Sequence, residues 1–185
     1  MKREDVMKYI ANNNGMINTE EAKEKNISLR NLQRLEEEGE LERVAQGLYL
    51  HKDFLVDPFY LVQYRSSKAI FSHTTALYLH GLSDENPRIL TMTIPSGWNT
   101  PLIKQDDLYK FYYYKEEIWE VGQEKIESPY GHIIKIYNRE RTICDCIMAI
   151  DEIGRNIVIK GIKEYMENKE SRDINKLYKY AEIFN

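Results

Sequence analysis

The chain has 185 residues, of which 42% are hydrophobic and 30% are charged, and its formal net charge at pH 7 is −4. This length supports one sizeable core or two small ones, and the composition is that of a folded protein. No apolar run reaches the roughly 18 residues of a membrane span, and MKREDVMKYI lacks the hydrophobic segment of a secretory signal. A cytoplasmic protein without membrane association is therefore expected. The net acidity disfavours nonspecific binding to polyanions, but it permits a specific, locally basic surface.

Two short helices are predicted at the start of the chain. The spacing of apolar side chains in EDVMKYIAN predicts a helix over residues 4–12. The NNNG stretch that follows favours the left-handed conformation in which helices end. Asn18, three residues before Glu21, predicts the N-cap of a second helix, which ends about two turns later near Asn26.

A third helix is predicted between Ser28, its N-cap, and Gly39, which ends it. Its expected buried stripe consists of Leu29, Leu32 and Leu35. A different face carries side chains that donate hydrogen bonds to base edges or phosphates, and they lie in the first two turns, where a recognition helix enters the major groove. These side chains are Arg30, Asn31, Gln33 and Arg34. Residues 36–38 are all glutamate, at the end of the helix that would leave the groove.

The next stretch, ELERVAQGLYL, predicts two short strands near residues 41–44 and 48–50, joined by a tip at Ala45-Gln46-Gly47. Three helices followed by a hairpin predict a winged helix-turn-helix, whose wing would bring Arg43 and Gln46 towards the DNA, where Ser28 is also expected to bind. Candidate phosphate contacts are Lys2, Arg3, Lys23 and Lys25. Because residues 1–50 contain 8 basic and 10 acidic side chains, a protein-docking module is the alternative.

The residue pattern of the sequence changes around residues 51–57. This change predicts a winged helix-turn-helix domain over 1–55 and a second domain over 56–185. Asp57 before Pro58 predicts a helix start, and residues 69–71 predict a strand. Ser72 is expected to cap a helix over 74–80.

Strands are predicted in RILTMTIP, YKFYYYK, IWEV and HIIKIYN, and helices after residue 138. The tyrosine run at 112–114 is better explained by a strand buried on one face than by base stacking. The predicted fold class is α+β, with a small, mostly antiparallel sheet and C-terminal helices in the larger second domain.

No catalytic, cofactor-binding or metal site is predicted. Cys144 and Cys146 are two residues apart, so on a helix their side chains point about 200° apart and cannot pair or hold one metal. Buried, reduced thiols are expected instead. His73 and His80 are about 10 Å apart along one predicted helix, too far to share a metal. Ser72 beside His73 lacks the G-x-S-x-G sequence of a nucleophile elbow.

Arg141 and Asp145 are four residues apart and predict an ion pair on a helix. The sequence has no Walker A loop, G-x-G-x-x-G or H-E-x-x-H motif, and no Gly-Ser followed by the paired D-x-D of a nucleotidyltransferase. We therefore expect a protein that is not an enzyme and that uses no cofactor.

The chain resembles the AbiEi family of antitoxins from type IV, or abortive infection, toxin–antitoxin systems. The resemblance covers nearly the whole chain and rests on four features in order. They are the winged-helix pattern ending in VAQGLYL, then SHTTALYLHGL, LTMTIP and ERTICD. Where the family usually has a basic residue before the Gly-x-Tyr of the wing, this chain has Gln46.

This resemblance implies two roles. The first domain would bind inverted repeats of double-stranded DNA in its own promoter and repress the operon. The second would counter a nucleotidyltransferase-like toxin in phage defence, without requiring a stable complex. The oligomeric state stays open, with monomers that bind DNA cooperatively as one option.

The alternative is a stand-alone winged-helix repressor whose second domain senses a ligand or dimerises. A downstream gene with nucleotidyltransferase motifs would favour the antitoxin. The sequence ends at AEIFN before its helical pattern is complete, which is typical of a trimmed chain or a short last helix.

Overall fold

The computed structural model of the protein describes residues 2–184. Contacts between residues divide the chain into unit 1, which comprises Met1–Arg65 and Glu127–Ile134, and unit 2, which comprises Ser66–Ile126 and Lys135–Asn185. Unit 1 thus extends beyond the boundary at 55/56 expected from the sequence.

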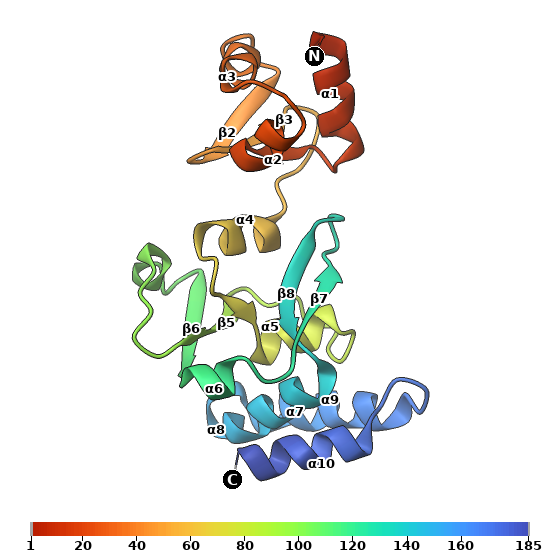
Figure 1. The fold of residues 1–185 in the computed structure, drawn as a ribbon. Coiled ribbons are helices and arrows are strands. Elements are labelled where there is room, and N and C mark those ends of the chain that lie inside the picture. Colours follow the sequence, from red (N-terminus) through yellow and green to blue (C-terminus); the bar gives the residue numbers. More distant parts are fainter. Residues whose placement is uncertain (1, 185) are drawn as a thin grey trace. The chain divides into compact units, whose positions relative to one another are not determined.

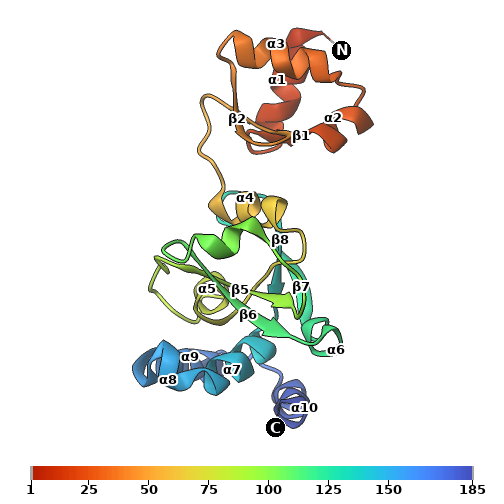
Figure 2. The same ribbon diagram turned by 90° about the vertical axis from the view of Figure 1, so that its left-hand side faces the viewer.

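Residues 2–65 of unit 1 form helices and short strands (Figures 1 and 2). In chain order they are α1 (Arg3–Asn12), β1 (Met16–Asn18), α2 (Thr19–Glu24), α3 (Leu29–Glu37), β2 (Leu41–Ala45), β3 (Leu48–His51) and α4 (Pro58–Arg65). The strands form an antiparallel sheet in the order β1-β3-β2. The three helices and the hairpin match the prediction, whereas β1 was not predicted, because a three-residue strand has no readable periodicity.

Local capping signals fix the helix ends of unit 1. The Asn18 side chain accepts a hydrogen bond from the Glu21 amide at 2.9 Å. The Ser28 hydroxyl accepts one from the Asn31 amide at 3.2 Å, as predicted for the third helix. Gly39, with a φ of 72°, follows the C-cap of α3 and ends the helix.

The main core of unit 1 lies between the three helices and the sheet. Its fully or nearly buried side chains are Val6, Ile10, Ile17, Ala22, Ile27, Leu32, Leu35, Leu41 and Tyr49. The prediction that Leu29 belongs to this stripe is wrong, because its side chain is 51% exposed. Leu29 lies about 60° around the helix from Leu32, at the edge of the buried arc, and in the first turn, beside an open cavity.

A second apolar cluster explains why α4 belongs to unit 1. Buried Met16, Leu48 and Leu50 pack against side chains of α4, including Tyr60 and Tyr64. Asp57 caps α4 by accepting hydrogen bonds from the Phe59 and Tyr60 amides at 2.9 and 3.0 Å.

The Asp57 carboxylate also binds the turn over residues 127–134. It accepts a hydrogen bond from the Ser128 hydroxyl and lies 3.0 Å from the Nδ1 atom of His132, whose ring stacks on Tyr60. Burial acts to raise the pKa of Asp57, but the hydrogen bonds from His132 and Ser128 outweigh burial, and the pKa lies below its usual value. Within unit 1, the Asp57 carboxylate therefore holds the 127–134 turn to the start of α4.

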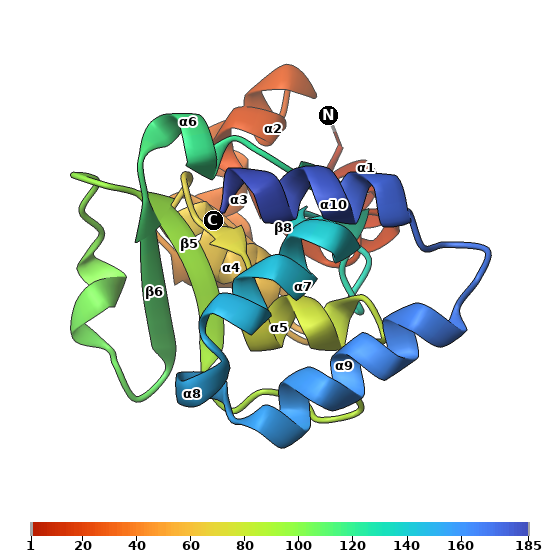
Figure 3. The same cartoon turned by 90° about the horizontal axis from the view of Figure 1, so that it is seen from below.

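The remaining elements follow the order β4 (Ile70–Phe71), α5 (His73–Leu79), β5 (Leu90–Pro95), η1 (Pro101–Lys104), β6 (Tyr109–Tyr114), α6 (Glu116–Trp119), β7 (Gln123–Glu127), β8 (Ile133–Tyr137), α7 (Arg139–Met148), α8 (Ile150–Ile153), α9 (Arg155–Glu167) and α10 (Ile174–Ile183). Five strands among the described residues form a sheet in the order β6-β5-β4-β8-β7. Helix α5 contacts β5 on one side and α7 on the other, and α7 also contacts α9 and α10 (Figure 3).

The five-stranded sheet is mixed rather than mostly antiparallel as expected. Strand β4 pairs with β5 antiparallel, but β5 pairs with β6 and β4 pairs with β8 in parallel. The connection through η1 returns the chain to the same end of the sheet before β6 begins. Alternating apolar residues predict a strand and not its direction, which depends on such connections.

Two further local predictions were wrong. The IWEV stretch was expected as a strand, but residues 116–119 form helix α6, whose first turn carries Glu116 and Glu117. Ser72 occupies the N-cap position of α5 but makes no side-chain cap. Its hydroxyl instead accepts a hydrogen bond from Thr93 at 2.9 Å and contacts the His73 ring.

None of the helices within residues 2–184 combines the length and the hydropathy of a membrane span.

Candidate nucleic-acid interface

The outer face of α3 carries the polar side chains that the sequence singled out. Arg30, Gln33 and Arg34 are exposed, and Asn31 is half-buried. The opposite face is fixed by Leu32 and Leu35, which are 0% and 1% exposed. Because these two leucines set the rotation of the helix, Arg30, Gln33 and Arg34 are held towards solvent and Asn31 lies at the edge of the buried side. These four polar residues are here termed the α3 donor face.

The charges along α3 change from basic to acidic. Within residues 2–184, the Arg30 guanidinium takes part in no ion pair, whereas Arg34 lies 3.6 Å from the Glu38 carboxylate at the far end of the helix. Both partners of the Arg34–Glu38 pair are about half-exposed, so the pair is weak and exchangeable. The Arg30 guanidinium in the first turn of α3 is thus available to bind an anion.

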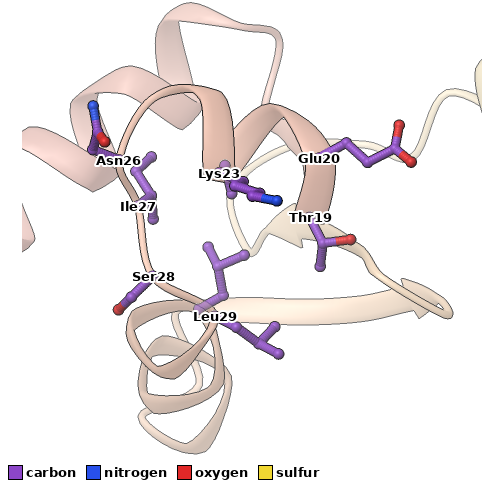
Figure 4. A pocket seen from close by; sticks show the side chains of 9 residues that line it. Thr19, Glu20, Lys23, Asn26, Ile27, Ser28 and Leu29 are labelled. Carbon is purple, nitrogen blue, oxygen red and sulfur yellow. The ribbon is translucent and has the colours of Figure 1, made fainter.

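An open cavity of about 590 Å³ lies between α2 and α3 (Figure 4). Its lining is mostly apolar, and Leu29 and Lys23 contribute side chains to it from the two helices. The remaining lining residues are Thr19, Glu20, Ala22, Asn26, Ile27, Ser28 and Leu32. The cavity therefore opens beside the first turn of α3. Its lining residues Leu29 and Leu32 directly precede Arg30 and Gln33 in the sequence.

The β2–β3 turn is anchored next to α2 and α4. The Thr19 amide donates a hydrogen bond to the Gly47 carbonyl at 2.9 Å, and the Tyr64 hydroxyl donates one to the Gln46 carbonyl at 3.1 Å. Gly47 has a φ of 74°, which favours glycine. The exposed Gln46 side chain is therefore presented by a fixed backbone, and Thr19 links this turn to the α2–α3 cavity.

The other predicted contacts fall into separate places. Arg43 is exposed on β2, opposite Tyr49 of β3. Lys25 lies over the Tyr9 ring, with 5.8 Å between its amine and the ring centroid. Lys2 is exposed just before α1.

Arg3 lies at the acidic end of α3. Its guanidinium is 3.1 Å from the Glu38 carboxylate and 3.2 Å from the Glu40 carboxylate. The structure therefore groups Lys23 with the start of α3 and places Arg3 at the opposite end.

Sequence reasoning missed three residues of this region. Thr19 and Tyr64 were not singled out, and Leu29 was assigned to the buried stripe. The contacts of Thr19 and Tyr64 depend on the tertiary position of the β2–β3 turn, which carries no local signal. The sequence does carry a weak signal for the exposure of Leu29, because this residue lies at the edge of the apolar arc of the helix.

The side-chain types of unit 2 that can bind metals, namely histidine, cysteine, aspartate and glutamate, are spread over the described residues 2–184. No group of three or more metal-binding side chains is found in that part of the chain. Cys144 and Cys146 are buried free thiols, as predicted, and burial raises the pKa of Cys144 to about 11. The predicted ion pair is present, with Arg141 Nε 2.9 Å from Asp145 Oδ1.

Comparison with known protein families identifies this same region. Residues 4–50 match the family described as a transcriptional regulator, AbiEi antitoxin. Residues 4–50, here termed the AbiEi segment, are similar to this family. This segment runs from α1 to β3 and so contains the α3 donor face, the α2–α3 cavity and the β2–β3 turn. The AbiEi description is that of a regulator and antitoxin and not of an enzyme. No curated protein matches the chain.

Proposed function

We propose that the AbiEi segment is a winged helix-turn-helix that binds double-stranded promoter DNA, with α3 in the major groove and the β2–β3 hairpin as a short wing. The domain proposed for this activity spans residues 1–55. The order of helices and strands in unit 1 and the description of the matched family support this assignment. In this arrangement, the N-terminal turns of α3 contact base edges, and the turn before α3 lies near the phosphate backbone.

The α3 donor face is the observation that carries the proposal. Arginine pairs with guanine, and glutamine and asparagine pair with adenine, so Arg30, Asn31, Gln33 and Arg34 are suited to reading bases. Ser28 caps α3 directly before this face, Arg43 and Gln46 are proposed to contact the DNA from the wing, and the cations at Lys2, Arg3, Lys23 and Lys25 are the proposed phosphate contacts. Glu38 already neutralises part of the Arg34 charge, so Arg30 is the strongest of the proposed contacts.

The proposed target is a set of inverted repeats in the promoter of the protein's own operon, which the protein would repress in the cytoplasm. Residues 56–185 would counter a nucleotidyltransferase-like toxin in phage defence, without a stable complex and without a cofactor. A regulator described as an antitoxin supports this pairing of roles. Monomers that bind cooperatively to adjacent repeats would recognise the inverted repeats without forming a dimer in solution.

A co-expression experiment tests both roles. The full chain is expressed with its neighbouring gene, and growth is compared with that of cells expressing the neighbour alone. In parallel, a reporter carries the upstream promoter with or without its inverted repeats. We expect growth rescue and repression that depends on the repeats. Toxicity that the chain does not relieve would contradict the antitoxin role, and unchanged reporter activity would contradict the repressor role.

A pocket in unit 2 supports the second candidate, a stand-alone repressor with a ligand-sensing domain. The pocket measures about 580 Å³ and is lined by Arg88, Lys110, Tyr112 and Glu152 among others. The Lys110 and Glu152 side chains form an ion pair across it. Two results would favour this candidate. The protein would release promoter DNA when a metabolite extract is added, and it would not relieve the toxicity of the neighbouring gene product.

A further inference from the structure

An exposed leucine stands on the same arc of α3 as the proposed base contacts. Leu29 is 51% exposed, although the other two leucines of this helix are almost fully buried. Successive residues of an α-helix are rotated by about 100°, so Leu29 lies about 40° from Gln33 and one turn before it. The arc that faces solvent in the first two turns therefore combines an isobutyl group, a carboxamide and, at Arg30, a guanidinium.

The surroundings of Leu29 leave space for an apolar partner. Leu29 lines the α2–α3 cavity together with the apolar side chains of Ala22, Ile27 and Leu32. Lys23 and Glu20 line the same cavity from α2, so its charged side chains are one cation and one anion. The apolar wall lies next to the exposed Arg30 and Gln33 of the α3 donor face, an arrangement that suits a partner with hydrogen-bond acceptors and a small apolar group.

We infer that Leu29 contacts the C5-methyl group of a thymine in the major groove and makes the protein select thymine at that position. This inference rests on the proposed DNA binding by α3 and adds a specificity that hydrogen bonds do not supply. The thymine methyl group is the apolar feature of the major groove, and apolar side chains read it by direct contact. Gln33, one turn further along, is suited to an adenine of the same or a neighbouring base pair.

DNA without thymine methyl groups tests the inference. The promoter fragment is amplified with dUTP in place of dTTP, which removes the C5-methyl groups and keeps all Watson–Crick donors and acceptors. Burial of one methyl group changes affinity roughly 4-fold, so the wild type should bind the uracil fragment at least that much more weakly than the thymine fragment. Leu29→Ala should bind the thymine fragment about as weakly as the wild type binds uracil DNA, and should not distinguish the two fragments.

Two control variants separate the contact from other effects. Leu29→Met keeps an apolar side chain and should retain the preference for thymine. Leu55→Ala removes a leucine that is 78% exposed and lies outside α2 and α3, and it should retain the full preference. Because alanine is a strong helix former at an exposed position, Leu29→Ala should melt at the same temperature as the wild type.

The outcomes separate this inference from the proposed function. A Leu29→Ala variant that still prefers thymine DNA as strongly as the wild type would overturn the inference and leave DNA binding by α3 intact. The wild type could also bind the thymine and uracil fragments equally well, and both more tightly than unrelated DNA. This result would likewise overturn the inference and leave DNA binding by α3 intact. Wild-type binding to the promoter no tighter than to unrelated DNA would overturn the proposed function itself.

Discussion

His73 combines an unusual backbone with an unusual side-chain environment. It begins α5 with a φ of 50°, a conformation that few non-glycine residues adopt, and its side chain is only 1% exposed. Its ring stacks on Tyr112 with 3.5 Å between the centroids. Burial, and to a lesser extent the charges of Arg141 and Lys110, lowers the pKa of His73 to about 3. The sequence carried no signal for this stacking partner.

This lowered pKa predicts a loss of stability in mild acid. Between pH 6.5 and 3, the unfolded chain binds a proton at residue 73 that the folded protein does not bind, so the free energy of unfolding falls as the pH falls. The contribution is at most about 1.4 kcal/mol per pH unit. We expect His73→Asn, which tolerates the left-handed backbone, to have a shallower dependence between pH 7 and 5 in urea titrations. An unchanged slope in this variant would contradict the assignment.

Arg141 is fully buried and holds several elements of unit 2 together. It pairs with Asp145, donates hydrogen bonds to the carbonyls of Ile118 and Val121, and lies 4.0 Å from the ring centroid of Phe184. Burial raises the pKa of Asp145 to about 6, against the opposing effect of Arg141. The i, i+4 spacing predicted the Arg141–Asp145 pair. The contact of Arg141 with Phe184, the C-cap residue of α10, could not be predicted from local spacing.

The Arg141–Asp145 pair should show strong coupling. Arg141→Met leaves a buried carboxylate without its partner and should destabilise unit 2 by about 3–5 kcal/mol. Adding Asp145→Leu to this variant should restore part of the loss, because neither charge is then buried. Chemical denaturation of the wild type, both single variants and the double variant measures the coupling. Additive losses in the double variant would show that the two side chains stabilise the fold independently.

At the scale of elements, local chemistry determined what could be predicted. The caps at Asn18 and Ser28 and the stop at Gly39 are signals within a few residues, and the structure places all three as expected. Strand β1 pairs with β3, which follows α2, α3 and β2 in the chain, and the parallel pairing of β5 with β6 depends on the connection through η1. Helix α6 spans only residues 116–119, too short for its period to be read. The exposed side of α3 was predictable, whereas the cavity beside it required the position of α2.

Two glycines of unit 1 allow the cost of a positive φ to be separated from crowding. Gly39 and Gly47 have φ values of 72° and 74°. A Cβ atom on Gly39 would meet nothing within 4 Å, whereas one on Gly47 would lie 3.0 Å from the Thr19 hydroxyl and 3.1 Å from the Tyr64 hydroxyl.

The matched substitutions should therefore differ. Gly39→Ala should cost about 1–2 kcal/mol, the price of the left-handed conformation alone, and Gly47→Ala should cost more, because the anchored turn must also shift. Thermal unfolding of both variants measures the difference. A Gly47→Ala variant as stable as Gly39→Ala would show that the β2–β3 turn is not held tightly by Thr19 and Tyr64.

At the scale of the whole molecule, the two proposed roles should be separable. A fragment of residues 56–185 keeps α4, Asp57 and the turn over 127–134 that Asp57 binds. We expect this fragment to relieve the toxicity of the neighbouring gene product without repressing the promoter, because it lacks α3. Growth rescue and reporter activity in the same cells measure the two roles. A folded fragment that gives no rescue would count against separate domains.

The central claim is that the first turns of α3 bind promoter DNA. Its most direct test compares the promoter affinity of the wild type, an Arg30→Ala/Arg34→Ala double variant and an Arg155→Ala/Lys169→Ala control that removes the same charge from exposed positions in unit 2. Each lost base contact costs about 1–3 kcal/mol, so the α3 variant should bind at least about 30-fold more weakly, while the control binds normally. The α3 variant should still relieve toxicity. An undiminished promoter shift for the α3 variant would contradict the account.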